Sequence, residues 1–191
     1  DIKRKNKKES HLMRSDDIPT VQSPIRWEKM GSSSQPKRTG EERLLPIRRL
    51  QISDRYKGFL DLLSQLSPCG PITDEEDFLT RFSDLASLGD GHAVVVAEDD
   101  QTGRIVATGA LLVERKFLRV CGKVGHIEDV VVDATARGTG LGQCMVQHLA
   151  DRARAAGCYK VILNCTAEMR GFYEKCGFKE KNVQMAIYFH D

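Results

Sequence analysis

The stretch that decides the fold reads IEDVVVDATARGTGLG and covers residues 127–142. Its first half is an apolar run typical of a buried strand, and its second half is a glycine-rich loop before a helix with Leu141, Met145 and Leu149 at helical spacing. When a strand, a glycine-rich loop and a helix follow one another, the unpaired backbone N–H groups at the N-terminus of the helix are directed toward an anion above the loop. Arg137 adds a permanent charge with a planar set of donors. The pattern predicts a pyrophosphate site, with an ordinary strand-to-helix turn as the alternative.

The elements on either side are predicted from the spacing of apolar residues. The first half is predicted to hold a strand over 46–51, a helix that begins at Ser53, a second helix behind a capping box at 73–76, and a hairpin of strands over 92–98 and 104–114. The apolar positions of the first helix are Tyr56, Phe59, Leu60, Leu63 and Leu66, and the second helix is expected to bury Phe78, Leu79, Phe82 and Leu85. The second half is predicted to hold a strand over 127–132, a helix over 141–156, a strand over 159–164, a short helix over 169–175 and a last strand over 183–188. This order predicts an α/β fold, a mixed sheet with helices on both faces.

Composition limits the class of protein. The chain has 191 residues, of which 40% are hydrophobic, enough for one domain with a two-layer core. Its 29 Lys and Arg nearly balance 27 Asp and Glu, which argues against a nucleic-acid-binding domain. The six cysteines form no Cys-x-x-Cys pair and show no zinc-like spacing to a histidine, so we expect reduced thiols, an intracellular protein and no metal. No apolar run is long enough for a transmembrane span.

Residues 1–44 are polar and rich in proline and serine, and we expect them to be a disordered extension of a domain that covers 45–191. The basic cluster at 3–8 is most simply a solvated charge run. A nuclear signal, or a peripheral contact with an anionic membrane such as the cytosolic face of the endoplasmic reticulum, is the alternative. The segment Met30–Ser34 looks like a translation start, which would place residues 1–29 upstream of the true start.

The glycine-rich segment resembles the coenzyme A signature of the GNAT superfamily of N-acetyltransferases. Four segments, 116–119, 125–132, 157–160 and 171–178, follow the order and spacing of the eukaryotic, plant-like glucosamine 6-phosphate N-acetyltransferase family. The resemblance runs from about Leu45 to the C-terminus. It implies the GNAT fold, in which two central strands splay and acetyl-CoA lies in the gap. It also implies a cytoplasmic homodimer that acetylates the amine of D-glucosamine 6-phosphate on the route to UDP-N-acetylglucosamine.

The resemblance also implies two sets of binding residues. Acetyl-CoA would contact Val130, Val131, Val132, Arg137, Gly138, Thr139, Gly140, Leu141, Gly142, Tyr173, Glu174 and Lys175. The amino sugar would contact Ser67, Lys116, Phe117, Leu118, Arg119, Glu128, Asp129, Val130, Tyr159 and Lys160, some of them across a dimer interface. Taken singly, the acidic strand end and the basic residues also suit an ordinary solvated surface.

The reaction needs no covalent enzyme intermediate, because a neutral amine attacks a thioester directly once the partners are aligned. The candidate catalytic residues are Tyr173, Asn164 and Asp129. Tyr173 would protonate the departing thiolate, since a phenol with a pKa near 10 is protonated at neutral pH. Simple packing of Phe172 and Tyr173 on the sheet is the alternative.

The chain departs from the family at three places. Asn164 stands where relatives carry a carboxylate, Met169 replaces an asparagine, and the last predicted strand lacks an arginine. Asn164 and Met169 suggest a catalytically weakened acyl-CoA-binding subunit as one rival function. Another enzyme of the superfamily, which acetylates a protein or peptide amine, is the other rival. Basic residues near Lys116 and Lys123 favour a phosphorylated acceptor over a basic peptide.

Overall fold

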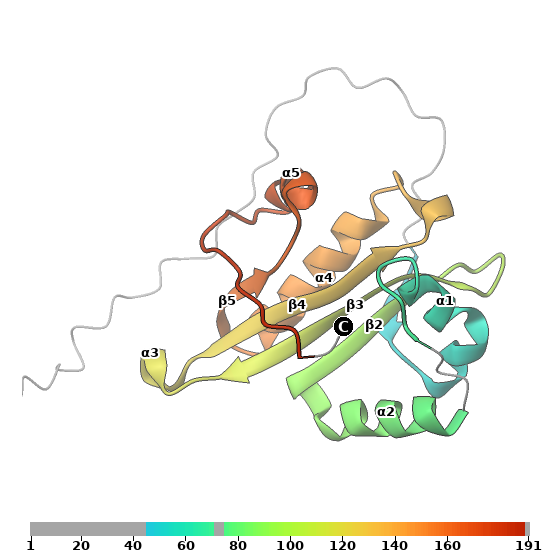
Figure 1. Cartoon of the computed structure of the whole chain (residues 1–191), viewed down its shortest axis with the longest axis horizontal. Helices are drawn as coiled ribbons and strands as arrows, with labels where there is room; N and C mark the ends of the chain where they lie inside the picture. Colours follow the sequence, from blue (N-terminus) through green and yellow to red (C-terminus); the bar gives the residue numbers. More distant parts are fainter. Residues whose placement is uncertain (1–44, 71–74, 190–191) are drawn as a thin grey trace, which may run out of the picture. The chain divides into compact units, whose positions relative to one another are not determined.

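The computed structural model of the chain describes residues 45–70 and 75–189. Its helices and strands are β1 (Ile47–Arg49), α1 (Phe59–Leu63), α2 (Glu75–Ser87), β2 (His92–Glu98), β3 (Ile105–Arg115), α3 (Leu118–Cys121), β4 (Lys123–Val132), α4 (Leu141–Ala155), β5 (Cys158–Leu163) and α5 (Arg170–Lys175) (Figure 1). The predicted extension over 1–44 and the first half of the predicted capping box, Thr73 and Asp74, lie outside the described residues.

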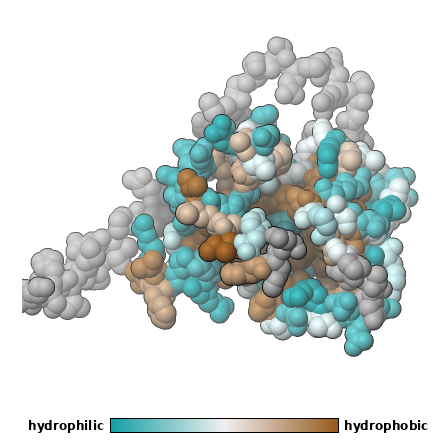
Figure 2. Space-filling view, in the orientation of Figure 1, coloured by the Kyte–Doolittle hydropathy of each residue, from teal (hydrophilic) through white to brown (hydrophobic). Residues whose placement is uncertain are grey.

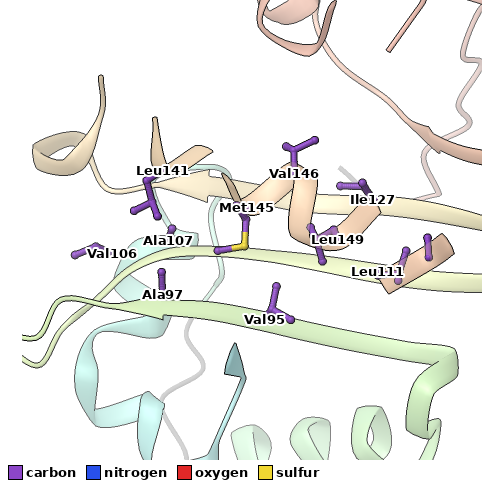
Figure 3. Packing of buried hydrophobic residues seen from close by; sticks show 11 residues of the cluster. Val95, Ala97, Val106, Ala107, Leu111, Ile127, Leu141, Met145, Val146 and Leu149 are labelled. Carbon is purple, nitrogen blue, oxygen red and sulfur yellow. The ribbon is translucent and has the colours of Figure 1, made fainter. Parts of the chain in front are cut away.

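The five strands form one mixed sheet in the order β1-β2-β3-β4-β5. Neighbours are antiparallel from β1 to β4, whereas β4 and β5 are parallel. Helix α4 covers one face, where Met145 and Leu149 pack against Val95, Leu111 and Ile127 (Figure 3). Helices α1 and α2 cover the other face with the buried side chains of Phe59, Leu62 and Phe78. The predicted mixed sheet with helices on both faces is confirmed.

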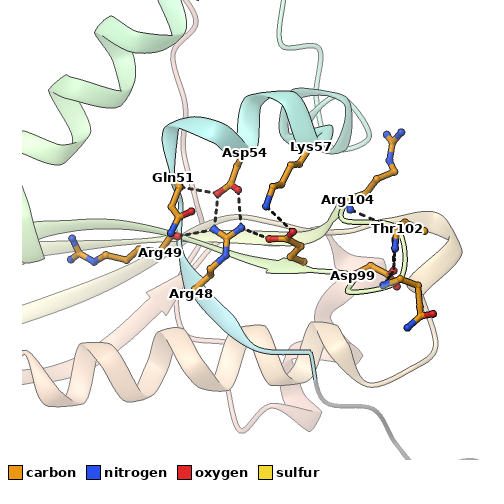
Figure 4. A network of polar contacts seen from close by, with 10 residues as sticks. Arg48, Arg49, Gln51, Asp54, Lys57, Asp99, Thr102 and Arg104 are labelled. Atoms are coloured by element: carbon orange, nitrogen blue, oxygen red, sulfur yellow. Dashed lines mark hydrogen bonds and ion pairs between the residues drawn. The ribbon is translucent and has the colours of Figure 1, made fainter.

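A polar network fixes the start of the domain to the sheet (Figure 4). Arg48 of β1 donates to both oxygens of Asp54, each at 2.7 Å, and to Glu98 of β2 at 2.6 Å. Lys57 donates to the other oxygen of Glu98 at 2.7 Å. Asp54 is fully buried, and the two carboxylates raise the pKa of Arg48 above its ordinary value. Loss of Arg48 would leave the buried Asp54 carboxylate without its charged partner, so this network anchors the segment that leads into α1.

The first predicted helix is wrong in its continuity. A 3-10 helix over Ile52–Lys57 ends at Gly58, which has φ 82°, and α1 begins after it. Gln51 rather than Ser53 precedes this turn as its cap. Glycine adopts this positive φ without strain, so Gly58 is what lets the chain break between the two helical segments. The apolar faces of both predicted helices are also narrower than expected, because Tyr56, Leu66 and Leu79 are exposed.

The predicted last strand over 183–188 is also wrong, since the described residues form no strand after β5. The side chains of Val183, Met185 and Ile187 alternate as a strand would require, yet they are 88%, 92% and 81% exposed. Alternation marks the side chains that a strand would bury, but a strand also needs a neighbouring backbone to pair with. This one chain supplies none to the segment.

Candidate functional site

A β-bulge in β4 forms the centre of the candidate site. Between the pairs Thr108–Val131 and Ala110–Glu128, two residues of β4, Asp129 and Val130, face the single residue Gly109 of β3. Asp129 has φ 53°, in the left-handed region that a non-glycine residue enters only at a cost of about 1–3 kcal/mol. A side chain at Gly109 would meet Leu149 at 2.9 Å and Val130 at 3.3 Å. Glycine at position 109 therefore leaves room for Val130 of the bulge and for α4 packed over it. The bulge turns Asp129 out of the strand's alternation.

The strands β4 and β5 part just beyond this point. Their last pair is Ile127–Leu163, while β4 continues to Val132. Glu128 of β4 and Asn164, the residue that follows β5, both have exposed side chains. The backbone edge of β4 from Glu128 to Val132 thus has no strand partner on the β5 side, and an extended amide chain such as the pantetheine arm of coenzyme A could pair with it. This is the splay that the fold implies.

The glycine-rich loop after β4 suits a pyrophosphate. Gly138 and Gly140 have φ values of 78° and 86° with open space where a side chain would start, so backbone conformation is what selects glycine at both positions. Gly140 is the N-cap of α4, and no side chain caps this helix. The first N–H groups of α4 and its helix dipole therefore face outward without an acidic competitor. The Arg137 guanidinium lies against the loop and donates to the Val132 carbonyl at 3.1 Å.

Helix α5 brings Tyr173 to the same opening. Phe172 packs against Gly142 of α4, where a β-carbon would lie 3.2 Å from its ring, and the Phe172 and Tyr173 rings meet edge to face at 5.0 Å. Burial raises the pKa of Tyr173, and the nearby Cys165, Cys176 and Glu128 raise it further. The phenol is therefore held in its protonated form, the form that a proton donor needs.

The predicted acceptor residues fall into separate places within one chain. Glu128 and Asp129 lie at the bulge, but the segment 116–119 and Tyr159–Lys160 lie near the start of β4, where Lys123 pairs with Cys158. Six positions along a strand separate Lys123 from Asp129, a span of roughly 20 Å. Three residues of the hairpin tip at α3, Arg119, Val120 and Cys121, are left-handed, and Phe117 and Val120 are each 98% exposed. One chain does not bring the two groups together.

A cavity of about 560 Å³ lies between α2 and the sheet, on the face opposite α4. This volume is ordinary for a small-molecule site, about 300–1,000 Å³. It reaches the bulge, because Thr108, Gly109, Ala110 and Asp129 line it. Aromatic side chains of α1 and α2 form much of its wall, and Arg81 and His92 are its cationic or basic members among the described residues. Sequence analysis did not single out Arg81 or His92.

A third missed residue is Gln65, in the turn after α1. Its side chain donates to the Asp133 carboxylate at 2.8 Å and accepts from the Ala134 N–H at 3.1 Å. It thereby joins the turn that carries Ser67 to the loop that follows β4. Hydrogen bonds from Thr135 and Gln65 lower the pKa of Asp133, which keeps this carboxylate charged. No sequence pattern indicates a role for Gln65. The bulge in β4 did have a signal in the sequence, because an isolated glycine inside an apolar strand, here Gly109, is typical of a bulge.

Among residues 45–70 and 75–189, no group of three or more His, Cys, Asp and Glu side chains is placed to hold a metal ion. Within the same ranges no helix is both long and apolar enough to cross a membrane.

The chain is similar to two named plant proteins and to one solved plant structure. It is 61% identical to "Glucosamine 6-phosphate N-acetyltransferase 1" of Oryza sativa subsp. japonica over 150 residues, 78% of this chain and 90% of the relative. It is 53% identical to "Glucosamine 6-phosphate N-acetyltransferase" of Arabidopsis thaliana over 143 residues, 75% and 95% of the two chains. The crystal structure of glucosamine-6-phosphate N-acetyltransferase from Arabidopsis thaliana superposes with a TM-score of 0.75 at 49% identity, over 78% of this chain and all of that one.

The same fold occurs in more distant proteins. A predicted acetyltransferase from Clostridium acetobutylicum, solved with acetyl-CoA, matches with a TM-score of 0.57 at 20% identity over 76% of this chain and 96% of that one, which bears on the fold alone. The model of the acetyltransferase (GNAT) family matches residues 59–178, from the first helix through the loop to the end of α5 and the turn after it. The splayed strands, the uncapped helix start and these similarities agree: the chain belongs to the acetyltransferase (GNAT) family.

Proposed function

We propose that this acetyltransferase moves the acetyl group of acetyl-CoA to the amine of D-glucosamine 6-phosphate, giving N-acetyl-D-glucosamine 6-phosphate and free coenzyme A. The observation that carries the proposal is the parting of β4 and β5 after Ile127–Leu163, beside a bulge that presents Asp129 and before an uncapped helix start. The similarity to plant enzymes named for this reaction supports the choice of acceptor.

In this proposal the cosubstrate occupies the splay. The pyrophosphate sits on the N–H groups of the Arg137–Gly142 loop, and the pantetheine arm pairs with the free edge of β4. The acetyl carbonyl then lies at the bulge, where the backbone N–H of Val130 would stabilise the oxyanion. Because these donors are backbone groups fixed by the fold, little reorganisation is needed during the reaction.

The chemical step is a direct transfer. The neutral amine of the sugar attacks the acetyl carbon, forming the C–N bond while the C–S bond breaks. The amine proton passes to water or to a nearby carboxylate, Glu128 or Asp129, and Tyr173 protonates the departing thiolate. Asn164, at the mouth of the splay, would align the reacting groups by hydrogen bonding and cannot act as a base.

We also propose that the enzyme works as a homodimer. The apolar side chains of the α3 tip and of the C-terminal segment are exposed, and Figure 2 shows them as brown patches at these two places. Exposed apolar surface of this kind marks an interface, and a second copy is the partner that would also place the segment 116–119 at an acceptor site.

The six free cysteines suit a reducing compartment, and we propose that the protein works in the cytoplasm. Any contact with the endoplasmic reticulum would be made by residues outside those described.

A thiol-release assay tests the function. With acetyl-CoA present, the full chain is given glucosamine 6-phosphate or a lysine peptide, and free coenzyme A is followed. We expect release that depends on the sugar phosphate and exceeds release with the peptide by at least tenfold in kcat/KM. Preference for the peptide would support the rival function, and binding of coenzyme A without release on any amine would indicate a non-enzyme.

A mixing experiment tests the shared site. We expect Tyr173→Phe and Arg119→Ala each to be weak alone. When equal amounts are mixed and allowed to exchange subunits, about a quarter of wild-type activity should return, because half of the dimers are mixed and each has one intact site. No recovery in a mixture shown to contain mixed dimers would place both residues in one chain's site.

A further inference from the structure

The Glu114 carboxylate, near the end of β3, contacts two basic side chains. The Lys116 ammonium donates to Oε1 at 2.5 Å, and the Nε2 atom of His126 on β4 lies 2.9 Å from Oε2. Because an ionised carboxylate only accepts hydrogen bonds, the second contact requires a proton on Nε2 of the imidazole. The hydrogen bonds from Lys116 and from His126 lower the pKa of Glu114, which keeps the carboxylate charged. Glu114 therefore links both strands of the hairpin to the first residue of the α3 tip, the segment 116–122.

The α3 tip is fixed at its base and exposed further out. The Lys116 N–H donates to the Gly122 carbonyl at 2.9 Å, which closes the segment. A side chain at Gly122 would meet the Tyr159 ring at 3.1 Å, so the base of the tip lies against the start of β5. The Lys116 side chain is 29% exposed, whereas Val120 within α3 is 98% exposed. The bond to Glu114 thus keeps the Lys116 ammonium at the base of the tip.

A lysine held in this way is prepared for an anion. A free lysine side chain samples many rotamers, and fixing them on a ligand costs conformational entropy. The bond to Glu114 fixes the Lys116 side chain before a ligand arrives, so less entropy is lost on binding. An ammonium has three donors. Lys116 can therefore keep its bond to Glu114 and donate to a phosphate with another N–H.

Glu114 also has an effect of the opposite sign. Its negative charge repels a phosphate bound at Lys116, since such a contact lies within the screening length of about 8 Å at physiological salt. Removal of the charge alone would strengthen phosphate binding, whereas removal of the hydrogen bond would weaken it. Two substitutions separate these effects. Glutamine keeps an oxygen that accepts from Lys116 but loses the charge, and alanine loses both.

We propose that Glu114 is a positioning residue for the acceptor: it holds Lys116 ready to donate to the phosphate, while His126 fixes the carboxylate from the neighbouring strand. The His126 side chain is 25% exposed and belongs to β4, so it gives the carboxylate a rigid support. The proposal rests on the proposed function, because it explains how a residue of the expected acceptor segment is held. In the proposed dimer, Glu114 acts on the acceptor site to which its own segment 116–119 contributes.

The test compares Glu114→Ala with Glu114→Gln. We expect Glu114→Ala to raise KM for glucosamine 6-phosphate by about three- to thirtyfold at a kcat within about twofold of wild type, and Glu114→Gln to stay within about threefold in KM. With glucosamine, which lacks the phosphate, both variants should keep kcat/KM within about twofold of wild type. Asp151→Ala is the matched control, because Asp151 also accepts from two side chains, Arg154 at 2.5 Å and Gln147 at 3.0 Å, on the exposed side of α4. It should behave as wild type with both acceptors.

A double-mutant cycle tests whether Glu114 acts through Lys116. Because Lys116→Ala already removes the positioned group, Glu114→Ala should raise KM little further in the double variant. Additive effects would overturn the proposal. A lower KM in both Glu114→Ala and Glu114→Gln would also overturn it, since the acceptor would then meet only the charge. An equal loss with glucosamine would make Glu114 a purely structural residue.

Calorimetric titration of glucosamine 6-phosphate into the coenzyme A complex separates this proposal from the proposed function. Weaker binding in Glu114→Ala, with Glu114→Gln close to wild type, supports the positioning role even if the wild-type chain does not acetylate the sugar. Acetylation by the wild type, together with equal binding by the wild type and Glu114→Ala, would overturn the positioning role and leave the proposed function standing. Absence of binding to the wild type would overturn both.

Discussion

The Gln65 side chain donates to the Asp133 carboxylate at 2.8 Å and accepts from the next residue's N–H, so one amide joins the turn after α1 to the loop after β4. The first segment carries Ser67, an expected acceptor contact, and the second leads into the pyrophosphate loop. The two substrates would therefore be held by segments that are fixed to each other.

Loss of this link should affect binding more than chemistry. We expect Gln65→Ala to raise KM for acetyl-CoA and for the sugar phosphate by about two- to tenfold, the range for an exposed hydrogen bond, at nearly unchanged kcat. Gln147→Ala is the matched control, because Gln147 makes the same bond to Asp151, at 3.0 Å, on the exposed side of α4. Steady-state kinetics decide the matter: equal KM values in the two variants would show that the link has no positioning role.

The phosphate loop can be tested with a charge. We expect Gly140→Asp to weaken coenzyme A binding by at least tenfold, because a carboxylate would stand beside the pyrophosphate where the helix dipole now attracts it. Gly103→Asp separates charge from backbone strain, since Gly103 also has a positive φ, 67°, and open space around it, but lies in the β2–β3 turn. If calorimetry gives both variants the wild-type affinity, the loop does not bind the pyrophosphate.

Removal of the Tyr173 hydroxyl should slow the chemistry. We expect Tyr173→Phe to lower kcat by about 10- to 1,000-fold while the affinity for acetyl-CoA stays close to wild type. Single-turnover measurement of acetyl transfer is the suitable assay, because it separates chemistry from product release. A wild-type rate for that step would make Tyr173 a packing residue.

The raised pKa of Tyr173 also predicts a pH effect on stability. Because burial favours the neutral phenol, the folded pKa lies above the ordinary value of 10.0. The resulting stabilisation is complete below about pH 10 and disappears as pH rises through the folded pKa. The free energy of unfolding of the wild type should therefore fall more steeply than that of Tyr173→Phe above pH 10, and the two should run in parallel below pH 9. Parallel curves throughout would mean that the phenol is not buried.

Asn164→Asp would introduce the carboxylate that the resemblance to the family implies at this position. Asn164 is exposed at the mouth of the splay, so the new charge should stay hydrated and the melting temperature should change little. We expect turnover to rise or to stay equal. Falls in both turnover and melting temperature at neutral pH, with recovery of stability in acid, would show that the site has been rebuilt around the amide.

Patterns that arise from contacts along the chain were predictable from the sequence. Strand, loop and helix around Gly138–Gly142 follow from local spacing and from glycines with positive φ. The break at Gly58 follows from a positive φ of 82° that glycine adopts freely, which is a local signal. The bulge at Asp129 lies opposite Gly109 of the neighbouring strand, so it needs a tertiary contact. The residues Arg81 and Gln65 carry no local pattern at all. Apolar and polar residues alternate in the segment 183–188 as they do in a strand, yet its apolar side chains are exposed. Such a pattern does not indicate whether a neighbouring backbone is present to pair with the segment.

The most direct test of the central claim is the initial rate of coenzyme A release by the full chain, with acetyl-CoA, in the presence and absence of glucosamine 6-phosphate, paired with mass analysis of the sugar. The account predicts release that requires the acceptor, with one N-acetylated sugar phosphate formed for each coenzyme A. Binding of coenzyme A with a release rate that the acceptor does not change, and no acetylated sugar, would contradict it.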